Sequence, residues 1–295
     1  GIAPAFSVLE FEPPDANSDG YFAPSSDTLE AILSSVQALM AGNLSLSVAE
    51  VAVVGYEVCR GEGPEAGVAL WRSVDPGTGR ALFAWRAVGA RPLILGVPYP
   101  VTESPTLTEG VLALTDLSAR ALIVGGTHRC ASTVSSDCDG TTAACGGGQQ
   151  PYRDSDIGHV MDSVYQIAHE FLSEVHEDDL VVTLRGLSAF GVSISDGTTD
   201  PSSAETPAAR FGLALADVMT DQYVSSCNDW PGASLDQRAC GEDSVQGRYV
   251  NESPDPCTQV APTASGRFIH VAQSDEVLGH MDEVIEVLGS ILPEE

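Results

Sequence analysis

The sequence contains no lysine, because all 13 basic residues among its 295 are arginines. This absence excludes P-loop phosphate binding, Schiff-base chemistry and pyridoxal-phosphate enzymes, which all need a lysine amine. Aspartate and glutamate together number 42, so the formal net charge is −29. Binding to polyanions depends on clustered cationic side chains, so nucleic acid and anionic membrane surfaces are not expected partners. We interpret the acidity as a solvated, salt-tolerant surface; loading of cations is the alternative.

Long apolar segments are also absent, since no run approaches the roughly 18 consecutive apolar residues that a membrane span needs. The chain opens with Gly1-Ile2-Ala3-Pro4, without a charged and apolar leader. We interpret it as the mature region of an exported protein whose signal has been removed. With 43% hydrophobic residues it can bury a full core, so disorder is not expected as its main state.

The cysteine pattern predicts disulfides rather than a metal site. The seven cysteines are Cys59, Cys130, Cys138, Cys145, Cys227, Cys240 and Cys257. No pair has the C-x-x-C spacing of a zinc ribbon or a thioredoxin motif, and six lie in two loops rich in Gly, Ser, Asp and Pro. We therefore predict three disulfides, within the 130–145 and 227–257 regions, with Cys59 reduced in an apolar strand. Disulfides are typical of an extracytoplasmic or secreted protein.

Strand-like and helix-like runs alternate along the chain, which is the pattern of an α/β protein. We predict one three-layer α/β/α domain over residues 1–295, with a mixed, largely parallel sheet of about six to eight strands and disulfide-stapled loops. Two irregular loops fall at about 131–152 and 224–266. The expected strands are 7–12, 51–58, 67–74, 80–87, 92–97, 121–125, 180–184, 191–195 and 267–271. The expected helices are 28–41, 106–117, 155–176, 205–219 and 275–292.

Four of these strands end in polar or otherwise distinctive residues. If the strands are parallel neighbours, their carboxyl ends meet at one crevice, where sites of α/β proteins form. The strand at 92–97 leads to Tyr99, Glu103 and Glu109; the strand at 121–125 to His128 and Arg129; the strand at 180–184 to Arg185 and Ser188; and the strand at 267–271 contains His270.

Each of these candidates has a structural alternative. His128 follows a Gly-Gly-Thr turn and would face the crevice beside Arg129, or it would be a loop histidine bonded to backbone. His270 is a functional residue or a buried core histidine. Asp156 and His159 lie three apart on one face of an expected helix. They are a ligand pair or a histidine with its orienting carboxylate, or else a capping aspartate and a surface histidine.

Ser188 lies in Gly186-Leu187-Ser188-Ala189-Phe190-Gly191. This G-x-S-x-x-G pattern departs by one residue from the nucleophile elbow, so a nucleophilic role is not favoured.

The order of four clusters along the chain resembles that in a known group of enzymes. The clusters are Val97-Pro98-Tyr99-Pro100, Gly126-Thr127-His128-Arg129, Arg185-Gly186-Leu187-Ser188 and the late His270. The enzymes are the zinc-dependent amidohydrolases and carboxypeptidases of the phosphorylase/hydrolase-like fold, such as N-formylglutamate amidohydrolases. The resemblance covers roughly residues 92–275 and implies amide or peptide hydrolysis at a zinc held by histidines and an acidic residue.

By position, the two histidine ligands that this resemblance implies fall at Tyr99 and Arg185. Neither residue supplies the ligand needed, so zinc is conceivable as a cofactor but not favoured, and we expect no metal ligands. What remains of such a site is His128, Glu109, His270 and Glu103.

These observations lead to two functional hypotheses. One is an exported hydrolase-like protein acting on an amide or peptide substrate whose carboxylate is gripped by Arg129 and Arg185. The other is a non-catalytic relative that keeps the pocket to bind a small anion or ligand, and Tyr99 and Arg185 favour it. The arginines could instead form internal ion pairs.

The catalytic candidates are His128, Glu109 and His270; the substrate-binding candidates are Tyr99, Arg129, Arg185 and Ser188. Whether the protein is an enzyme, its substrate, its disulfide connectivity and its oligomeric state are left open.

Overall fold

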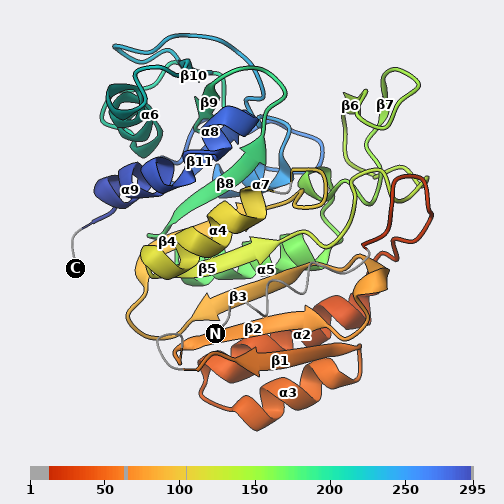
Figure 1. Ribbon diagram of the computed structural model, residues 1–295. Coiled ribbons are helices and arrows are strands. Elements are labelled where there is room, and N and C mark those ends of the chain that lie inside the picture. The colour runs from red at the N-terminus through yellow and green to blue at the C-terminus, as the bar shows by residue number, and fades with distance from the viewer. Residues whose placement is uncertain (1–12, 63–65, 104, 294–295) are drawn as a thin grey trace.

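The computed structural model describes residues 13–62, 66–103 and 105–293. Within them, nine strands form one mixed sheet in the order β1-β2-β3-β5-β4-β8-β11-β9-β10, and helices cover both of its faces (Figure 1). This confirms the predicted α/β/α architecture, with one strand more than expected. The expected strand at 7–12 lies outside the described residues, and the single domain stays a prediction.

The strands of the sheet are β1 (Tyr56–Arg60), β2 (Val68–Ser73), β3 (Leu82–Arg86), β4 (Arg91–Val97), β5 (Ala119–Val124), β8 (Leu180–Gly186), β9 (Val192–Ser195), β10 (Val224–Ser226) and β11 (Phe268–Gln273). A separate pair consists of β6 (Thr141–Thr142) and β7 (Gln150–Pro151). The helices are α2 (Ser26–Met40), α3 (Leu44–Ala52), α4 (Pro105–Asp116), α5 (Val164–Val175), α6 (Pro207–Val218), α7 (Val245–Val250), α8 (Asp275–Leu278) and α9 (Met281–Ile291), with 3-10 turns η3 (Pro76–Thr78) and η4 (Ile157–His159).

The centre of the sheet is parallel. Strands β5, β4, β8 and β11 are successive neighbours, and each adjacent pair runs parallel. Their sequences are nearly continuous apolar runs, which is typical of strands buried on both faces. The four strands chosen from the sequence are therefore parallel neighbours, as expected, and their carboxyl ends lie along one edge.

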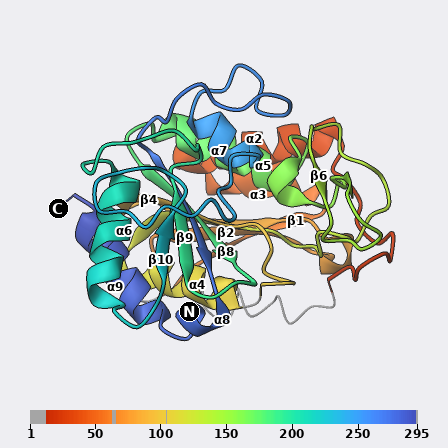
Figure 2. The same ribbon diagram turned by 90° about the horizontal axis from the view of Figure 1, so that it is seen from above.

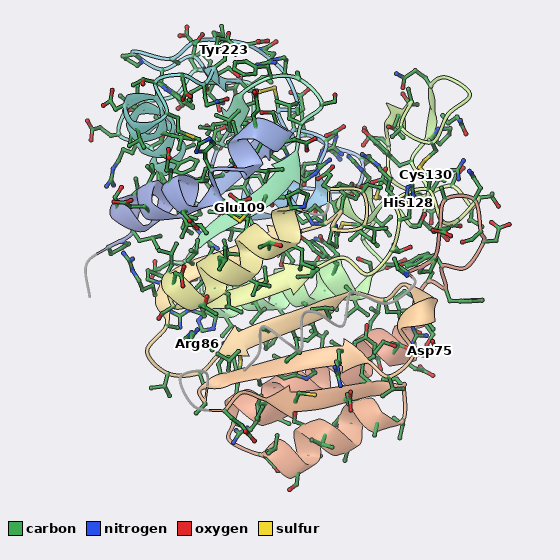
Figure 3. All side chains as sticks on the ribbon, viewed as in Figure 1. Asp75, Arg86, Glu109, His128, Cys130 and Tyr223 are labelled. Atoms are coloured by element: carbon green, nitrogen blue, oxygen red, sulfur yellow. A yellow bond between two sulfur atoms is a disulfide. The ribbon has the colours of Figure 1, made fainter. Side chains whose placement is uncertain are left out.

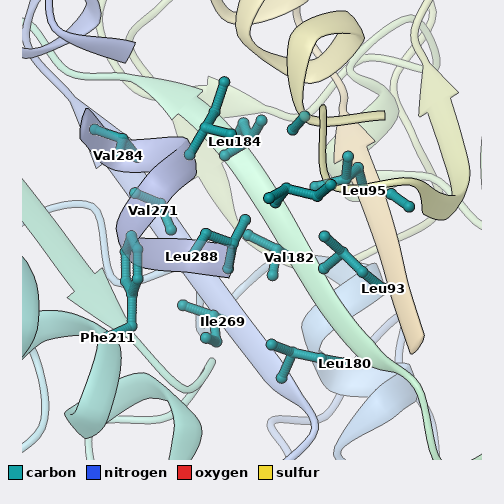
Figure 4. Close-up of a cluster of buried hydrophobic side chains, with 14 of the residues drawn as sticks. Leu93, Leu95, Leu180, Val182, Leu184, Phe211, Ile269, Val271, Val284 and Leu288 are labelled. Carbon is teal, nitrogen blue, oxygen red and sulfur yellow. The ribbon is translucent and has the colours of Figure 1, made fainter. Parts of the chain in front are cut away.

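Two hydrophobic cores flank this sheet. Helices α4, α6, α8 and α9 lie on one face and α2, α3, α5 and α7 on the other (Figure 2). Figure 4 shows the first core, in which Leu93, Val182 and Ile269 of the sheet belong to one cluster with Leu288 of α9. Because successive residues of a strand point to opposite faces, Ile94 and Val181 enter the second core. Each such fully buried side chain contributes about 1.5–3 kcal/mol.

Some element boundaries differ from expectation. The expected strand at 51–58 is the end of α3 followed by β1. Helix α3 begins after Asn43, whose side chain accepts a hydrogen bond from the Leu46 N–H, so this capped helix takes Val51 and Ala52, and a turn at 53–55 precedes β1. The expected helix at 155–176 begins only at Val164, after the capping Ser163.

Two further differences lie nearer the C-terminus. The expected helix at 275–292 is divided into α8 and α9, and the loop at 224–266 contains β10 and α7.

Three disulfides join Cys130 to Cys145, Cys138 to Cys257 and Cys227 to Cys240. Cys59 is free and half-buried on β1, so the predicted count is confirmed. The bridges use the six cysteines of the two predicted regions, and the structure supplies the connectivity that the sequence left open: Cys138–Cys257 joins the two loops. They lie side by side there, with the Asp139 N–H donating to the Cys257 carbonyl at 3.1 Å. Three disulfides are typical of an oxidising, extracytoplasmic compartment.

In the described part of the chain, no helix combines the length and apolar character needed to span a bilayer.

Candidate functional site

A pocket of about 480 Å³ lies at the carboxyl ends of the parallel strands. Its floor includes Thr183 from β8 and His270 from β11, with Pro98 just beyond β4. Residues 141–143 of the disulfide-stapled loop and residues 237–246, which contain Cys240, complete the walls. The pocket therefore lies at the edge of the sheet where the sequence predicts it, and disulfides anchor two of its walls.

The floor is polar because the sheet face toward α5 changes character along the strands. Val181 and Phe268 on this face belong to the hydrophobic core, whereas Thr183 and His270, two residues further on, line the pocket. Thr183 and His270 are partners in the β8–β11 register, so their side chains lie next to each other. Gly96 completes this row on β4 and leaves room for the Tyr165 hydroxyl, which a Cβ there would approach to 2.4 Å.

Two arginines pack against the ring of one buried tyrosine. The guanidinium carbons of Arg129 and Arg185 lie 4.5 and 4.2 Å from the centroid of the Tyr99 ring. Tyr99 is only 1% exposed, and its hydroxyl donates to Asp156 while accepting the Gly158 N–H at 3.0 Å. Tyr99 thus positions both arginines through its ring and is not among the residues that line the pocket.

Both arginines are paired with carboxylates. Arg129 donates from Nη2 and Nε to Asp156 Oδ2 at 2.8 and 3.2 Å. Arg185 donates from Nε and Nη2 to the two oxygens of Glu103 at 3.1 and 3.2 Å. The internal ion pairs that the sequence left open are therefore present.

These pairs do not use all of the guanidinium donors. Neither Asp156 nor Glu103 lines the pocket, whereas both arginines do. Within the described ranges, Nη1 of Arg129 and Nη1 of Arg185 take part in no hydrogen bond. A guanidinium has more N–H groups than one carboxylate uses, so each arginine can contact a ligand while its ion pair stays intact.

His159 is fixed between two carboxylates. Its Nδ1 lies 3.0 Å from Asp156 Oδ1, and its Nε2 lies 3.6 Å from Asp243 Oδ2. The Tyr152 ring stacks on the imidazole with centroids 3.6 Å apart, and the Tyr152 hydroxyl donates to Asp243.

The carboxylates set the protonation of this histidine. Burial alone would lower the pKa of His159, but Asp156 and Asp243 outweigh it and raise that pKa above its ordinary value. Burial alone would raise the pKa of Asp156, yet His159 and Arg129 hold it well below its usual range. The arrangement stabilises a positively charged imidazole at the pocket wall.

His270 is the opposite case. It is 1% exposed, and burial, reinforced by the charge of Arg185, lowers its pKa to about 3. It is therefore neutral at physiological pH and offers one N–H donor and one acceptor. In the described part of the chain neither ring nitrogen has a hydrogen-bond partner, and Thr183 Oγ1 also lacks one. Buried polar groups are normally bonded, so the floor has unused hydrogen-bonding capacity.

The residues present do not fit a zinc site. Over residues 13–62, 66–103 and 105–293, no three His, Cys, Asp or Glu side chains are grouped so that they could hold a metal ion. Arg185 is a cation engaged by Glu103, and Tyr99 is bonded to Asp156. Both nitrogens of His159 already face carboxylates, which leaves His270 as the one uncommitted imidazole of this pocket. A zinc ion needs at least three protein ligands.

The remaining sequence candidates lie elsewhere. His128 is half-buried, and its Nδ1 accepts the Cys130 N–H at 3.0 Å, which is the backbone-bonded alternative. Glu109 is fully buried in α4 and accepts from Gln273 Nε2 at 2.7 Å. Gln273 is three residues from His270 on β11, so Glu109 lies on the opposite face of the sheet. Ser188 is exposed. None of the three candidates lines this pocket, and Figure 3 shows Glu109 on α4, away from His128.

Sequence reasoning missed several pocket residues. Thr183 carries a signal, because it is the one polar residue within the apolar run Leu180–Leu184. The three-residue spacing of Asp156 and His159 is a sequence signal, but Asp156 is the N-cap of η4 and His159 its last residue, so neither lies on α5. Asp243 and Gln246 come from the irregular 224–266 loop and carry no motif, so only the tertiary structure identifies them.

Comparisons with known proteins complete this description. No family model matches the chain, and no curated protein matches it. A crystal structure named "putative metallopeptidase" from Shewanella amazonensis SB2B is similar at 13% identity and a TM-score of 0.33, covering 88% of this chain and 91% of that one. A "putative carboxypeptidase A" from Shewanella denitrificans OS-217 is similar at 8% identity and a TM-score of 0.36, covering 85% and 67%. These values are too low to transfer a site or an activity, and the resemblance to N-formylglutamate amidohydrolases stays a prediction.

Proposed function

We propose that this protein binds a small carboxylate-bearing ligand in the pocket at the carboxyl ends of β4, β8 and β11. One observation carries the proposal: two guanidinium groups line the same pocket as His270 and Thr183. Within the described chain each guanidinium has an unused Nη1, and the side chains of His270 and Thr183 have no hydrogen-bond partner. Arginine is the residue best suited to grip a carboxylate.

The charges that line the pocket support an anionic group beside the two arginines. Arg129 and Arg185 line the pocket, whereas the carboxylates that pair with them do not. Glu242 and Asp243 also line it, and Asp243 lies 3.6 Å from His159 Nε2, so the charge of His159 is offset by its own carboxylates. A ligand carboxylate would contact the arginines, while its neutral polar part would use His270 and Thr183.

This proposal describes a binding module. The neutral His270 is a weak base, because its pKa is about 3. Hydrolysis of an amide or peptide by this protein therefore remains a prediction from the sequence. Export of the protein, with removal of a signal, also remains a prediction. The three disulfides support an extracytoplasmic location.

The test is isothermal titration calorimetry with N-acetyl-alanine and, as a probe without the carboxylate, N-acetyl-alanine methylamide. The wild type should bind the acid and not the neutral amide. Arg185→Gln should weaken binding at least about tenfold, because a hydrogen bond to a charged group is worth about 1.5–3 kcal/mol. His270→Phe should weaken it as well, by removing both ring nitrogens.

The matched control is Arg210→Gln, which removes one positive charge at an exposed position of α6. It should leave binding unchanged. The proposal fails if the acid and the neutral amide bind alike, or if Arg185→Gln, folded by circular dichroism, binds as tightly as the wild type. Chromatography of the same mixtures for free alanine separates binding from hydrolysis.

A further inference from the structure

A second pocket, of about 350 Å³, lies beyond the carboxyl end of β9. It is formed by residues 196–208 on one side and 263–266 on the other, with Phe268 at its base. It shares no lining residue with the first pocket. Thr198 lines the second pocket and Thr199 lines the first, so the loop after β9 separates the two.

Two buried asparagines hold this loop in place. Asn228 is fully buried, accepts the Asp196 N–H at 3.0 Å and donates to the carbonyls of Thr198 and Asp200 at 3.0 and 2.9 Å. Asn251 donates to the Asp196 carbonyl at 2.8 Å and accepts the Ser265 N–H at 2.8 Å, which ties both sides of the pocket together. The pocket walls are therefore preorganised.

Asp196 is the chemically distinctive residue of this pocket. Its side chain is 2% exposed, and Oδ1 accepts from the Thr198 N–H, the Thr198 hydroxyl and Asn228 Nδ2 at 3.0, 2.7 and 2.9 Å. In the described part of the chain, Oδ2 accepts no hydrogen bond. Leaving a buried carboxylate oxygen without a donor is unfavourable, so a donor supplied by a ligand would be stabilising.

The lining determines which donor fits. Asp196 and Asp200 are its charged residues, and no arginine or histidine lines it. Phe268 and two prolines, Pro201 and Pro207, add apolar surface. Two carboxylates do not make a metal cage, and the described residues contain no metal-binding group of three. The volume lies at the lower end of the range for small-molecule sites.

We infer that this pocket binds a small organic ammonium ion, whose charged nitrogen donates to Asp196 Oδ2 while its alkyl part packs between Phe268 and the two prolines. The site is independent of the carboxylate pocket, because it rests on different residues and on the opposite ligand charge.

The experiment is calorimetric titration of the full chain with n-butylammonium, in about 0.15 M salt so that the net charge of −29 is screened. The variants are Asp196→Asn and its charge-matched control Glu205→Gln, an exposed carboxylate beside the pocket that does not line it. We expect the wild type and Glu205→Gln to bind alike and Asp196→Asn to bind at least about tenfold more weakly.

A second variant keeps the inference testable if Asp196→Asn does not fold. Thr263→Trp changes an exposed residue of the rim and should block the pocket without touching the core, so it should also abolish binding. The inference is overturned if n-butylammonium does not bind, if Asp196→Asn or Thr263→Trp binds it like the wild type, or if 1-butanol competes equally. Displacement of n-butylammonium by equimolar Ca²⁺ would indicate a metal site and would also overturn it.

Discussion

The guanidinium of Arg185 and the carboxylate of Glu103 form a two-point ion pair, with N–O distances of 3.1 and 3.2 Å. The same carboxylate accepts the Gly186 N–H at 2.7 Å, so it also anchors the end of β8. Arg185 occupies a position where the resemblance to zinc hydrolases implies a histidine. The pair therefore places a neutralised cation where such a hydrolase would hold a metal ligand.

Substitutions of Arg185 and Glu103 should have coupled effects on the free energy of unfolding. The two side chains are 17% and 14% exposed, so removing one partner leaves the other charge largely buried. We expect Arg185→Ala and Glu103→Ala each to lower the free energy of unfolding by about 3 kcal/mol, toward the lower end for buried pairs because some exposure remains. The double variant should lose less than the sum. Urea unfolding measures this coupling, and strict additivity would contradict it.

Glu109 should make stability fall as pH rises. Burial raises its pKa from 4.5 to about 8, against the opposing hydrogen bond from Gln273. The folded state therefore binds this proton more tightly than the unfolded state does. The resulting stabilisation is complete below about pH 4.5, declines as pH rises toward 8 and is lost above it.

Urea unfolding between about pH 5 and pH 9 tests this expectation. The wild type should lose stability relative to Glu109→Gln, which carries no titratable proton, by up to about 1.4 kcal/mol per pH unit. The exposed Glu205→Gln serves as the control and should follow the wild type at every pH. Parallel profiles for the wild type and Glu109→Gln would refute the assignment.

The disulfide that joins the two loops should matter most to stability. Cys138–Cys257 spans 119 residues, whereas Cys130–Cys145 and Cys227–Cys240 span 15 and 13. In the chain-entropy account, removing the long link costs about 4–5 kcal/mol and removing either short one about 3 kcal/mol. Paired Cys→Ser variants compared by thermal unfolding give this order, and an equal loss for all three pairs would contradict it.

Thiol chemistry provides a separate check of the cysteines. Titration of the denatured, unreduced protein should find one thiol per chain, at Cys59. Peptide mapping should recover a fragment that links residues 138 and 257. Seven free thiols would contradict the disulfides and the oxidising compartment together.

Zinc should not be retained. Arg185 is a cation, and Tyr99 is bonded to Asp156, so the positions that the resemblance assigns to histidine ligands cannot coordinate the ion. Elemental analysis after dialysis against zinc should find well under one equivalent per chain, and one retained equivalent would contradict this prediction. The variant Tyr99→His/Arg185→His then asks whether restored imidazoles gain zinc. Continued absence of binding in a folded variant would count against the resemblance.

The layers of the fold, and the sheet edge at which the pocket lies, follow from the amino-acid sequence alone. Apolar runs such as those of β4 and β8 bury both faces of a strand wherever they occur, so their number and spacing predict a parallel centre. Arg129, Arg185 and His270, which follow or end these runs, line one pocket at that edge for the same reason. The count of seven cysteines and the isolation of Cys59 in a strand likewise predicted three bridges and one free thiol.

The partner of each polar group, in contrast, depends on how distant segments of the chain pack together. Arg185 pairs with Glu103, 82 positions away, and the long-range Cys138–Cys257 bridge joins two loops that no local pattern brings together. Glu109 follows a strand that points at the pocket, yet α4 carries it to the other face of the sheet, where it meets Gln273. Hydrophobic periodicity is a local property of the chain, whereas ion pairs, hydrogen bonds and disulfides depend on which distant segments pack together.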